Sequence, residues 1–340
     1  MRTVLEGSGT IAAAAILLAG TLGAVRAQTV EELRSLSLEQ LSDLEVTSVS
    51  RRPEPISKAP ASVYVITNQD IRRSGAVSLP EVLRLAPNLE VAEVNAHDYA
   101  ISARGFDTFE SANKLLVLID GRSVYSPLHS GVFWDEQQVM LEDIDRIEVI
   151  SGPGGPLWGA NAVNGVINII TKAAAQTQGG LIAPYVGTKD SGVSARYGGA
   201  LGDLGAWRAY ALGFKRGETT APDGHGAGDD WDGHQAGLRT DLNAAGNAFT
   251  LQGDIYDNPL ENDSTVSGGD VLGRWRRQLS ERSAVEVQAY YDAVDHDSPG
   301  VEDYSHTYDV QAQHNLALGD RHQLVWGGGY RVIDKSSKTR

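Results

Sequence analysis

The 340-residue chain contains no cysteine, so neither a disulfide framework nor a thiolate metal site can contribute to its fold. Positive charge is also scarce, with 29 Lys and Arg against 44 Asp and Glu and a net charge of −15. A basic surface for phosphate groups is therefore not expected, which argues against nucleic acid as a partner.

Long apolar runs are missing after the first 27 residues, where no stretch of 18 or more apolar residues occurs. This predicts that only a closed β-barrel, and not helices, could carry the chain through a membrane. The apolar run at 11–25 follows Arg2 and ends in the small-residue pattern Val25-Arg26-Ala27. It predicts a secretory signal peptide over residues 1–27, because a membrane anchor needs a longer run less diluted by glycine and alanine.

A recognisable catalytic set is missing as well, since no nucleophile, base and oxyanion-binding group stand out together. We expect no enzymatic activity, no cofactor and no metal site. The loop 222–234 has two histidines among four aspartates, but their spacing matches no coordination motif and favours a solvated surface loop. The segment GPGGPLWG at 152–159 has dinucleotide-loop spacing without the following helix and acidic residue that such a loop requires.

The most informative stretch is DIDRIEVISGPGGPLWGANAVNGVINIITK, residues 143–172. Residues 147–150 and 166–171 have the β-branched density of buried strands. The glycines between them provide backbone positions that side chains would obstruct, and Asn164-Gly165 is a tight-turn signal.

Together with LLVLIDGRSVY at 115–125 and ISARGF at 101–106, this stretch resembles the plug domain of TonB-dependent outer-membrane receptors. The resemblance covers about 45–172, with three motifs in the family's order. One departure is Ser151, which stands where the family usually has an arginine before GPG. The resemblance implies an α+β plug domain followed by antiparallel transmembrane β-barrel strands.

The chain divides into a signal peptide (1–27), a periplasmic N-terminal segment (28–58), the plug domain (59–172) and the N-terminal part of an outer-membrane β-barrel (173–340). Within the plug, the pattern predicts strands at 61–67, 89–94 and 99–105, helices at 69–74 and after Ser78, and a hairpin at Asp120-Gly121. The expected barrel strands are 179–188, 192–200, 206–216, 233–242, 247–257, 269–279, 283–293, 305–316 and 322–333.

Short connections at 201–205, 243–246, 280–282 and 317–321 alternate with long ones at 217–232, 258–268 and 294–304. This alternation is typical of periplasmic turns and extracellular loops, so the first strand should run outward. Plugged outer-membrane transporters have 22 strands, so about nine of 22 are expected here, with a truncation inside an extracellular loop.

The N-terminal segment contains an expected amphipathic helix at 29–44, followed by extended chain rich in charge and proline. The resemblance implies a TonB box, a segment that pairs edge to edge with the periplasmic protein TonB. Its best match is Glu45, Val46, Thr47, Ser48 and Val49. A plain linker strand is the alternative, because strand addition makes loose demands on sequence.

The function implied by the resemblance is energised uptake of a scarce extracellular ligand, with a ferric siderophore as first candidate. Cobalamin or another large nutrient is the alternative, as is a non-transporting truncated fragment. The implied partners are TonB with its inner-membrane energising complex, an extracellular small-molecule ligand such as a metal chelate, and outer-membrane lipid. The implied location is the bacterial outer membrane, with the plug and N-terminus facing the periplasm. A soluble periplasmic or secreted binding protein, in which the β region forms a sandwich, is the second class.

Ligand contacts are expected in the plug loops at 95–99, 107–111 and 126–134. The candidate side chains are Tyr99, Tyr125, His129, Phe133 and Trp134, although such aromatics can equally pack the plug against the barrel. Arg104 in the RGF motif is expected to pair with a carboxylate on the barrel wall, Glu286 or Asp309.

Overall fold

The computed structural model describes residues 45–49, 51–52, 54–103, 105, 112–260, 263–319 and 321–339. The predicted signal peptide, the helix at 29–44, Arg104 and the loop 107–111 lie outside these ranges. Within the described ranges, no helix has both the length and the apolar character needed to cross a membrane.

A five-stranded sheet forms the centre of the N-terminal α+β domain. Its strand order is β3 (Ser62–Thr67), β8 (Ile144–Ser151), β9 (Gly165–Thr171), β6 (Leu115–Ile119) and β7 (Arg122–Ser123). Only the β6–β9 pair is parallel, and the other pairs are antiparallel. The aliphatic side chains of β6, β8 and β9 are almost fully buried except for Ile170, which is partly buried, so the burial agrees with the prediction from the dense β-branched runs.

Two helices and a second hairpin pack around this sheet. Helix α2 (Asn68–Ser74) opens with a capping box at Thr67, and α3 (Leu79–Leu83) is capped by Ser78, as predicted. The hairpin consists of β4 (Leu89–Glu93) and β5 (Tyr99–Ala103). The remaining short elements are β1 (Glu45–Val46), β2 (Glu54–Pro55), η1 (Ile56–Lys58), η2 (Leu141–Asp143), α4 (Gly155–Trp158) and η3 (Ala174–Gln176).

Two glycines have roles that other residues could not fill. Asp120 and Gly121 have φ values of 49° and 84°, so both occupy the left-handed region that a two-residue hairpin turn requires. At Gly165, an added Cβ would lie 2.6 Å from the carbonyl oxygen of Ile150. The predicted hairpin is confirmed, and the close approach of β8 to β9 depends on the absence of a side chain at 165.

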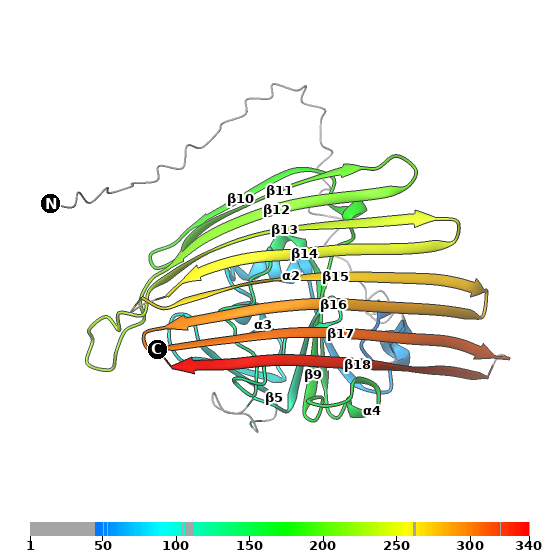
Figure 1. Cartoon of the computed structure of the whole chain (residues 1–340), viewed down its shortest axis with the longest axis horizontal. Helices are drawn as coiled ribbons and strands as arrows, with labels where there is room; N and C mark the ends of the chain where they lie inside the picture. The colour runs from blue at the N-terminus through cyan, green and yellow to red at the C-terminus, as the bar shows by residue number, and fades with distance from the viewer. Residues whose placement is uncertain are drawn as a thin grey trace. The chain divides into compact units, whose positions relative to one another are not determined.

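The C-terminal half is a nine-stranded antiparallel sheet in which each strand pairs with its sequence neighbours (Figure 1). Its strands are β10 (Gly179–Val186), β11 (Ser191–Ala200), β12 (Gly205–Arg216), β13 (Trp231–Ala244), β14 (Asn247–Pro259), β15 (Thr265–Ser280), β16 (Ser283–Ser298), β17 (Val301–Leu318) and β18 (His322–Thr339). All nine predicted strands are confirmed.

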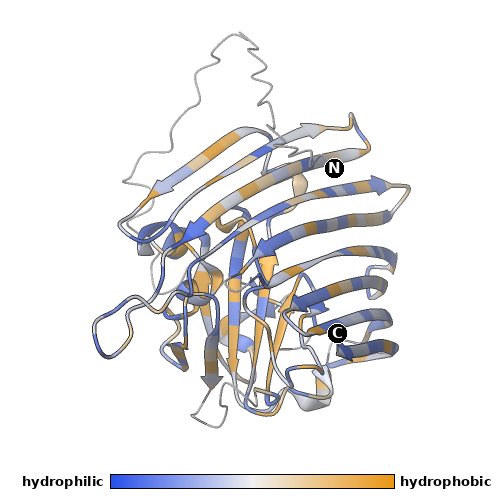
Figure 2. Cartoon of the chain, turned by 60° about the vertical axis from the view of Figure 1, so that its left-hand side comes forward, coloured by the Kyte–Doolittle hydropathy of each residue, from blue (hydrophilic) through white to orange (hydrophobic). Residues whose placement is uncertain are grey.

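The two faces of this sheet differ in polarity because side chains alternate along each strand. Outward residues such as Ile182 and Ile255 are 72% and 68% exposed, whereas Gln288 and Asp309 on the other face are 7% and 4% exposed. Figure 2 shows the result as banded strands in this sheet and largely apolar strands in the α+β domain. An apolar outer face and a polar inner face are typical of a β-barrel wall in lipid.

Two of the predicted long connections are wrong. The strands continue into them, so the connections shrink to 260–264 and 299–300, while 217–230 stays long. Pairs such as Asp257 with Ser267 and His296 with Asp303 extend the ladder beyond the apolar alternation. Backbone hydrogen bonds do not require apolar side chains, so hydropathy underestimates the strand lengths.

Candidate functional site

The α+β domain contacts the nine-stranded sheet at both of its ends. We call the end that carries the 217–230 connection the long-connection end, and the end with the tight turns at 201–204, 245–246 and 281–282 the tight-turn end. At the long-connection end, Trp231 Nε1 donates to the carbonyl of Ala96 at 2.8 Å. Towards the tight-turn end, Gln313 Nε2 donates to the carbonyl of Arg51 at 2.9 Å.

Residues 45–49 are held on the α+β domain by one buried carboxylate. Glu148 on β8 is 0% exposed and accepts from the backbone N–H groups of Thr47 (3.0 Å) and Ser48 (2.8 Å). It also accepts from the hydroxyl of Ser48 and from Arg146 Nε at 2.8 Å. Asn168 on β9 donates to the Ser48 hydroxyl oxygen at 2.9 Å. Glu148 and Asn168 therefore attach the segment to β8 and β9.

Apolar contacts reinforce the attachment. Val46 and Val49 belong to a buried cluster that includes Leu116 and Ile150 of the five-stranded sheet. Trp158 Nε1 donates to the carbonyl of Ser48 at 2.7 Å. Charge and proline after residue 44 predict extended, exposed chain, and the exposure is wrong for Val46, Ser48 and Val49, which are buried.

Charged side chains form a second set of contacts between the domain and the inner face of the sheet. Asp143, which is 2% exposed, pairs with Arg196 on β11 and with Arg208 on β12, the latter at 3.3 Å. Arg122 pairs with Asp270 at 2.9 Å and with Asp292. Burial alone lowers the pKa of Arg122, but these carboxylates outweigh it and raise the pKa above its usual value.

Asp120, at the β6–β7 turn, accepts hydrogen bonds from both the α+β domain and the sheet. It accepts from the backbone N–H of Thr171 at 2.9 Å and from Gln252 Nε2 at 2.9 Å, and it lies 3.7 Å from Arg239 Nη1. Burial raises the pKa of Asp120, but Arg239 and these hydrogen bonds outweigh it, so the pKa lies below its ordinary value. Asp120 is therefore held as a carboxylate between the domain and the wall.

The five predicted ligand residues separate into two groups. Tyr99 and Trp134 are 9% and 5% exposed and belong to the main core cluster. Burial, together with the nearby Glu93, raises the pKa of Tyr99 to about 12. The structure therefore places these two aromatics as packing residues.

Tyr125, His129 and Phe133 are only partly buried. The rings of His129 and Phe133 stack with centroids 4.6 Å apart, and Phe133 lies 4.5 Å from the ring of His296 on β16. These residues lie towards the long-connection end, where a solute approaching that end could reach them.

The same end contains acidic and imidazole groups that are not among the five candidate side chains, although His97 and Asp98 lie in the predicted ligand loop 95–99. His97, Asp98 and Asp135 each offer a ligand atom, and these atoms lie within 4.8 Å of one another. Nearby, Glu136 Oε1 and His296 Nε2 share a hydrogen bond of 2.6 Å. Burial raises the pKa of Asp135 to about 6 and that of Glu136 to about 7. No linear motif could have predicted this cluster, because its members come from two separate loops.

The predicted partners of Arg104 have other ion pairs. Asp309 accepts from Arg331 Nε at 2.8 Å, and Glu286 lies 3.9 Å from Arg274 Nε. Ser151, at the position where the family usually has arginine, lies 2.5 Å from Asn88 Nδ2.

Comparison with known proteins identifies the domain that carries these contacts. Residues 55–166 match the family model of the TonB-dependent receptor plug domain. The chain carries a TonB-dependent receptor plug domain. The plug and the polar inner face of the sheet therefore have the arrangement that the sequence resemblance implies, and the predicted fold class is confirmed.

Sequence relatives support this assignment over part of their length. The vitamin B12 transporter BtuB of Vibrio vulnificus is 34% identical over 151 residues, 44% of this chain and 24% of the relative. BtuB of Photobacterium profundum is 29% identical over 215 residues, 57% of this chain and 34% of the relative. The chain thus spans about a quarter to a third of the length of these relatives.

Solved structures extend the similarity of fold into the nine-stranded sheet. BauA, the ferric preacinetobactin receptor from Acinetobacter baumannii, has a TM-score of 0.69 at 15% identity, over 86% of this chain and 50% of that chain. The copper transporter OprC has a TM-score of 0.65 at 17% identity, over 81% of this chain and 46% of that chain. At these identities the similarity concerns the fold alone.

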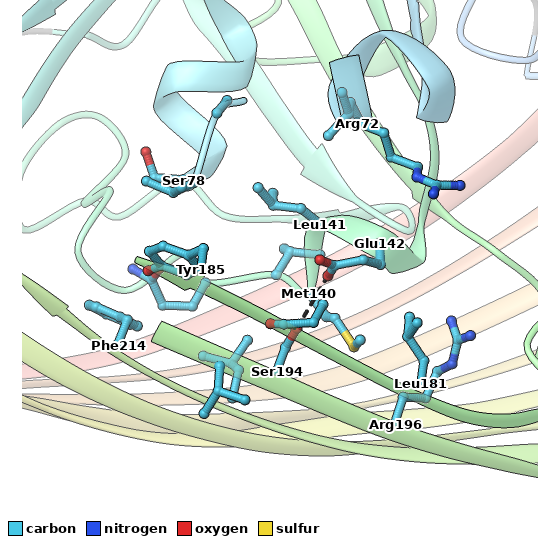
Figure 3. A pocket seen from close by; sticks show the side chains of 18 of the residues that line it. Arg72, Ser78, Met140, Leu141, Glu142, Leu181, Tyr185, Ser194, Arg196 and Phe214 are labelled. Atoms are coloured by element: carbon cyan, nitrogen blue, oxygen red, sulfur yellow. Dashed lines mark hydrogen bonds between the residues drawn. The ribbon is translucent and has the colours of Figure 1, made fainter. Parts of the chain in front are cut away.

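A cleft of about 640 Å³ separates the plug from the first strands of the sheet (Figure 3). Met140 and Leu141 line it from the plug, and Leu181 and Phe214 line it from the sheet. Across it, Ser194 donates to Glu142 at 3.3 Å. None of the five predicted ligand residues lines this cleft. The cleft is therefore a gap in the packing between the plug and β10–β12, and it is separate from Tyr125, His129 and Phe133.

Proposed function

We propose that the protein is a TonB-coupled outer-membrane receptor that binds an extracellular metal chelate and moves it towards the periplasm. The single observation that supports this best is the position of residues 45–49. They are attached to the central plug strands through Glu148, while the half-exposed aromatic group lies at the other end of the sheet. Ligand binding at the aromatic group can therefore be coupled to the release of residues 45–49 at the other end.

The coupling follows from the contacts of the docked segment. Glu45 and Val46 pair with Pro55 and Glu54, so this short hairpin must loosen before a partner strand can take up the same backbone groups. Force applied to the freed segment would act first on Glu148, in the middle of the plug sheet. The contacts between the plug and the wall are mostly polar, so the plug can shift within a wet lumen without exposing its apolar core.

The orientation belongs to this proposal. The apolar outer face suits hydrocarbon, and the protein would lie in the bacterial outer membrane with residues 45–49 and the tight turns facing the periplasm. The long-connection end would face the medium. TonB with its energising complex is then the periplasmic partner.

A ferric siderophore is the first candidate ligand, since two proteins of similar fold are BauA, a ferric preacinetobactin receptor, and PirA of Pseudomonas aeruginosa, a siderophore receptor. Cobalamin is the second candidate, and one observation favours it: the sequence relatives at 34% identity are vitamin B12 transporters. Both are metal chelates. The matches to those relatives cover 44% and 47% of this chain, and specificity also depends on connections between sheet strands.

Binding to the purified periplasmic domain of TonB tests this proposal. The detergent-solubilised chain should bind that domain more tightly in the presence of either a ferric siderophore panel or cyanocobalamin. Val46→Pro removes a backbone N–H needed for strand pairing and should abolish TonB binding while ligand quenching of tryptophan fluorescence persists. Glu45→Gln, a change at the exposed start of the segment, is the control. If Val46→Pro and wild type bind TonB equally, the proposed coupling is wrong.

A further inference from the structure

Three potential metal ligands converge at the long-connection end of the plug. His97 and Asp98 come from the turn between β4 and β5, and Asp135 comes from the loop that precedes η2. His97 and Asp135 are buried, at 8% and 3% exposure, and Asp98 is partly buried. The His97 Nδ1 to Asp98 Oδ2 distance is 3.4 Å.

The turn that carries His97 and Asp98 is held in shape from within. Asn95 Oδ1 accepts from the backbone N–H of His97 at 3.0 Å and from that of Asp98 at 2.6 Å. Asn95 Nδ2 donates to Asp98 Oδ2 at 2.9 Å, which orients the carboxylate. Such outer-shell hydrogen bonds are what metal sites use to fix their ligands.

The sheet fixes both halves of the cluster from outside. Next to His97, Ala96 donates its N–H to Asp229 at 3.0 Å and accepts from Trp231 at 2.8 Å. Asn258 on β14 donates to the carbonyl of Asp135 at 2.8 Å. The turn and the loop are therefore anchored to neighbouring strands, which limits how far their side chains can separate.

One carboxylate oxygen of the cluster lacks a donor. Asp135 Oδ1 is buried and has no hydrogen-bond partner among the described residues. His296 on β16 does not supply this donor, because its Nε2 is hydrogen-bonded to Oε1 of Glu136 at 2.6 Å. A buried carboxylate oxygen without a donor costs free energy, and a bound cation removes that cost.

We propose that His97, Asp98 and Asp135 bind one divalent transition-metal ion. Bonds of about 2.0 Å place tetrahedral ligands roughly 3.3 Å apart, which the His97–Asp98 distance already approaches. The three ligand atoms lie within 4.8 Å of one another, so a side-chain shift of at most about 1.5 Å brings Asp135 into the set.

The donor set defines the class of ion. One imidazole nitrogen with two carboxylate oxygens suits Zn²⁺ and its first-row neighbours, whereas Ca²⁺ takes six to eight oxygens. The two carboxylates balance the charge of the ion. Three protein ligands leave one tetrahedral position open, so water or a donor atom of an incoming molecule can complete the coordination. This site does not depend on TonB coupling or on the identity of the transported chelate.

Zn²⁺ titration of the full chain in detergent tests the proposal, with competition against a chromophoric chelator as readout. We expect one equivalent of Zn²⁺ to bind, and both Asp135→Asn and His97→Gln to weaken binding about 100-fold or more. Co²⁺ should give the visible absorption of a four-coordinate site in wild type and lose it in both variants. Millimolar Ca²⁺ should not displace Zn²⁺.

His225→Gln is the matched control, because His225 also neighbours an aspartate, Asp223 at 3.4 Å, but is 85% exposed. It should leave Zn²⁺ binding unchanged. Asp98→Asn, at the partly buried ligand, replaces Asp135→Asn if the latter does not fold by circular dichroism. No Zn²⁺ binding by the folded wild type, or binding that folded ligand variants retain, overturns the proposal.

Discussion

Replacing Glu148 with glutamine tests how strongly residues 45–49 are attached to the plug. The carboxylate, itself fully buried, receives two backbone N–H groups, the Ser48 hydroxyl and Arg146 Nε. A hydrogen bond to a charged group contributes about 1.5–3 kcal/mol. Glutamine keeps one acceptor oxygen but turns an amide donor towards groups that also donate. We therefore expect a loss of about 2–3 kcal/mol of docking free energy, or roughly 30- to 150-fold in the ratio of docked to released segment.

The absence of cysteine makes this loss measurable. Glu45→Cys introduces a single thiol at an exposed position next to the docked residues, so a nitroxide label reports only on this segment. Electron paramagnetic resonance spectra should change from broad to narrow lines when Glu148→Gln is added. Glu93→Gln, the same chemical change at an exposed position on β4, should leave the spectrum unchanged.

A smaller change provides a graded comparison. Ser48→Ala removes one hydroxyl and leaves the backbone donors in place, so it should cost about 1 kcal/mol and narrow the lines less. If the folded Glu148→Gln protein keeps the broad spectrum of the parent, with equal thermal stability, the carboxylate does not hold the segment and the reasoning fails.

Asp143→Asn removes the buried carboxylate shared by Arg196 of β11, which is partly buried, and Arg208 of β12, which is buried. It should lower the free energy of unfolding by about 3–5 kcal/mol in urea titrations; an unchanged urea midpoint would show that these pairs contribute nothing. Because the folded-state pKa of Asp120 is lowered, its stabilisation is present above an unfolded pKa of about 3.9 and is lost only as pH falls below that value. Unfolding titrations should thus show an acid-dependent loss below about pH 4 that is reduced in Asp120→Asn, and a loss between pH 7 and 5 absent from that variant would contradict the assignment. Gly165→Ala places a methyl 2.6 Å from the Ile150 carbonyl and should destabilise the plug by about 1–3 kcal/mol, measured by the same titration; wild-type stability would mean that β8 can move away.

Several features of the fold could be predicted from local pattern. The β-branched runs in 143–172 correspond to β8 and β9, the Ser78 cap opens α3, and Asp120-Gly121 forms the hairpin turn. Period-two alternation located all nine strands of the sheet. These features depend on neighbours in the chain, so the sequence pattern contains them.

The strand ends and the site could not be predicted in the same way. The pairing of β14 with β15 continues beyond Asp257, because backbone hydrogen bonds form whatever the hydropathy of the side chains. From the sequence, Tyr99, Trp134 and Phe133 are equivalent aromatic candidates for ligand contacts. Only the fold shows that Tyr99 and Trp134 pack in the core, whereas Phe133 stacks on His129 outside it.

The sequence by itself determined the class of the protein: three ordered motifs define the plug, and alternating hydropathy defines a sheet with one apolar and one polar face. Tertiary structure alone decided that Glu148 holds residues 45–49, and that Asp135 meets His97 and Asp98. Those contacts join residues far apart in the chain, and their energies depend on burial and distance, which exist only once the plug has folded.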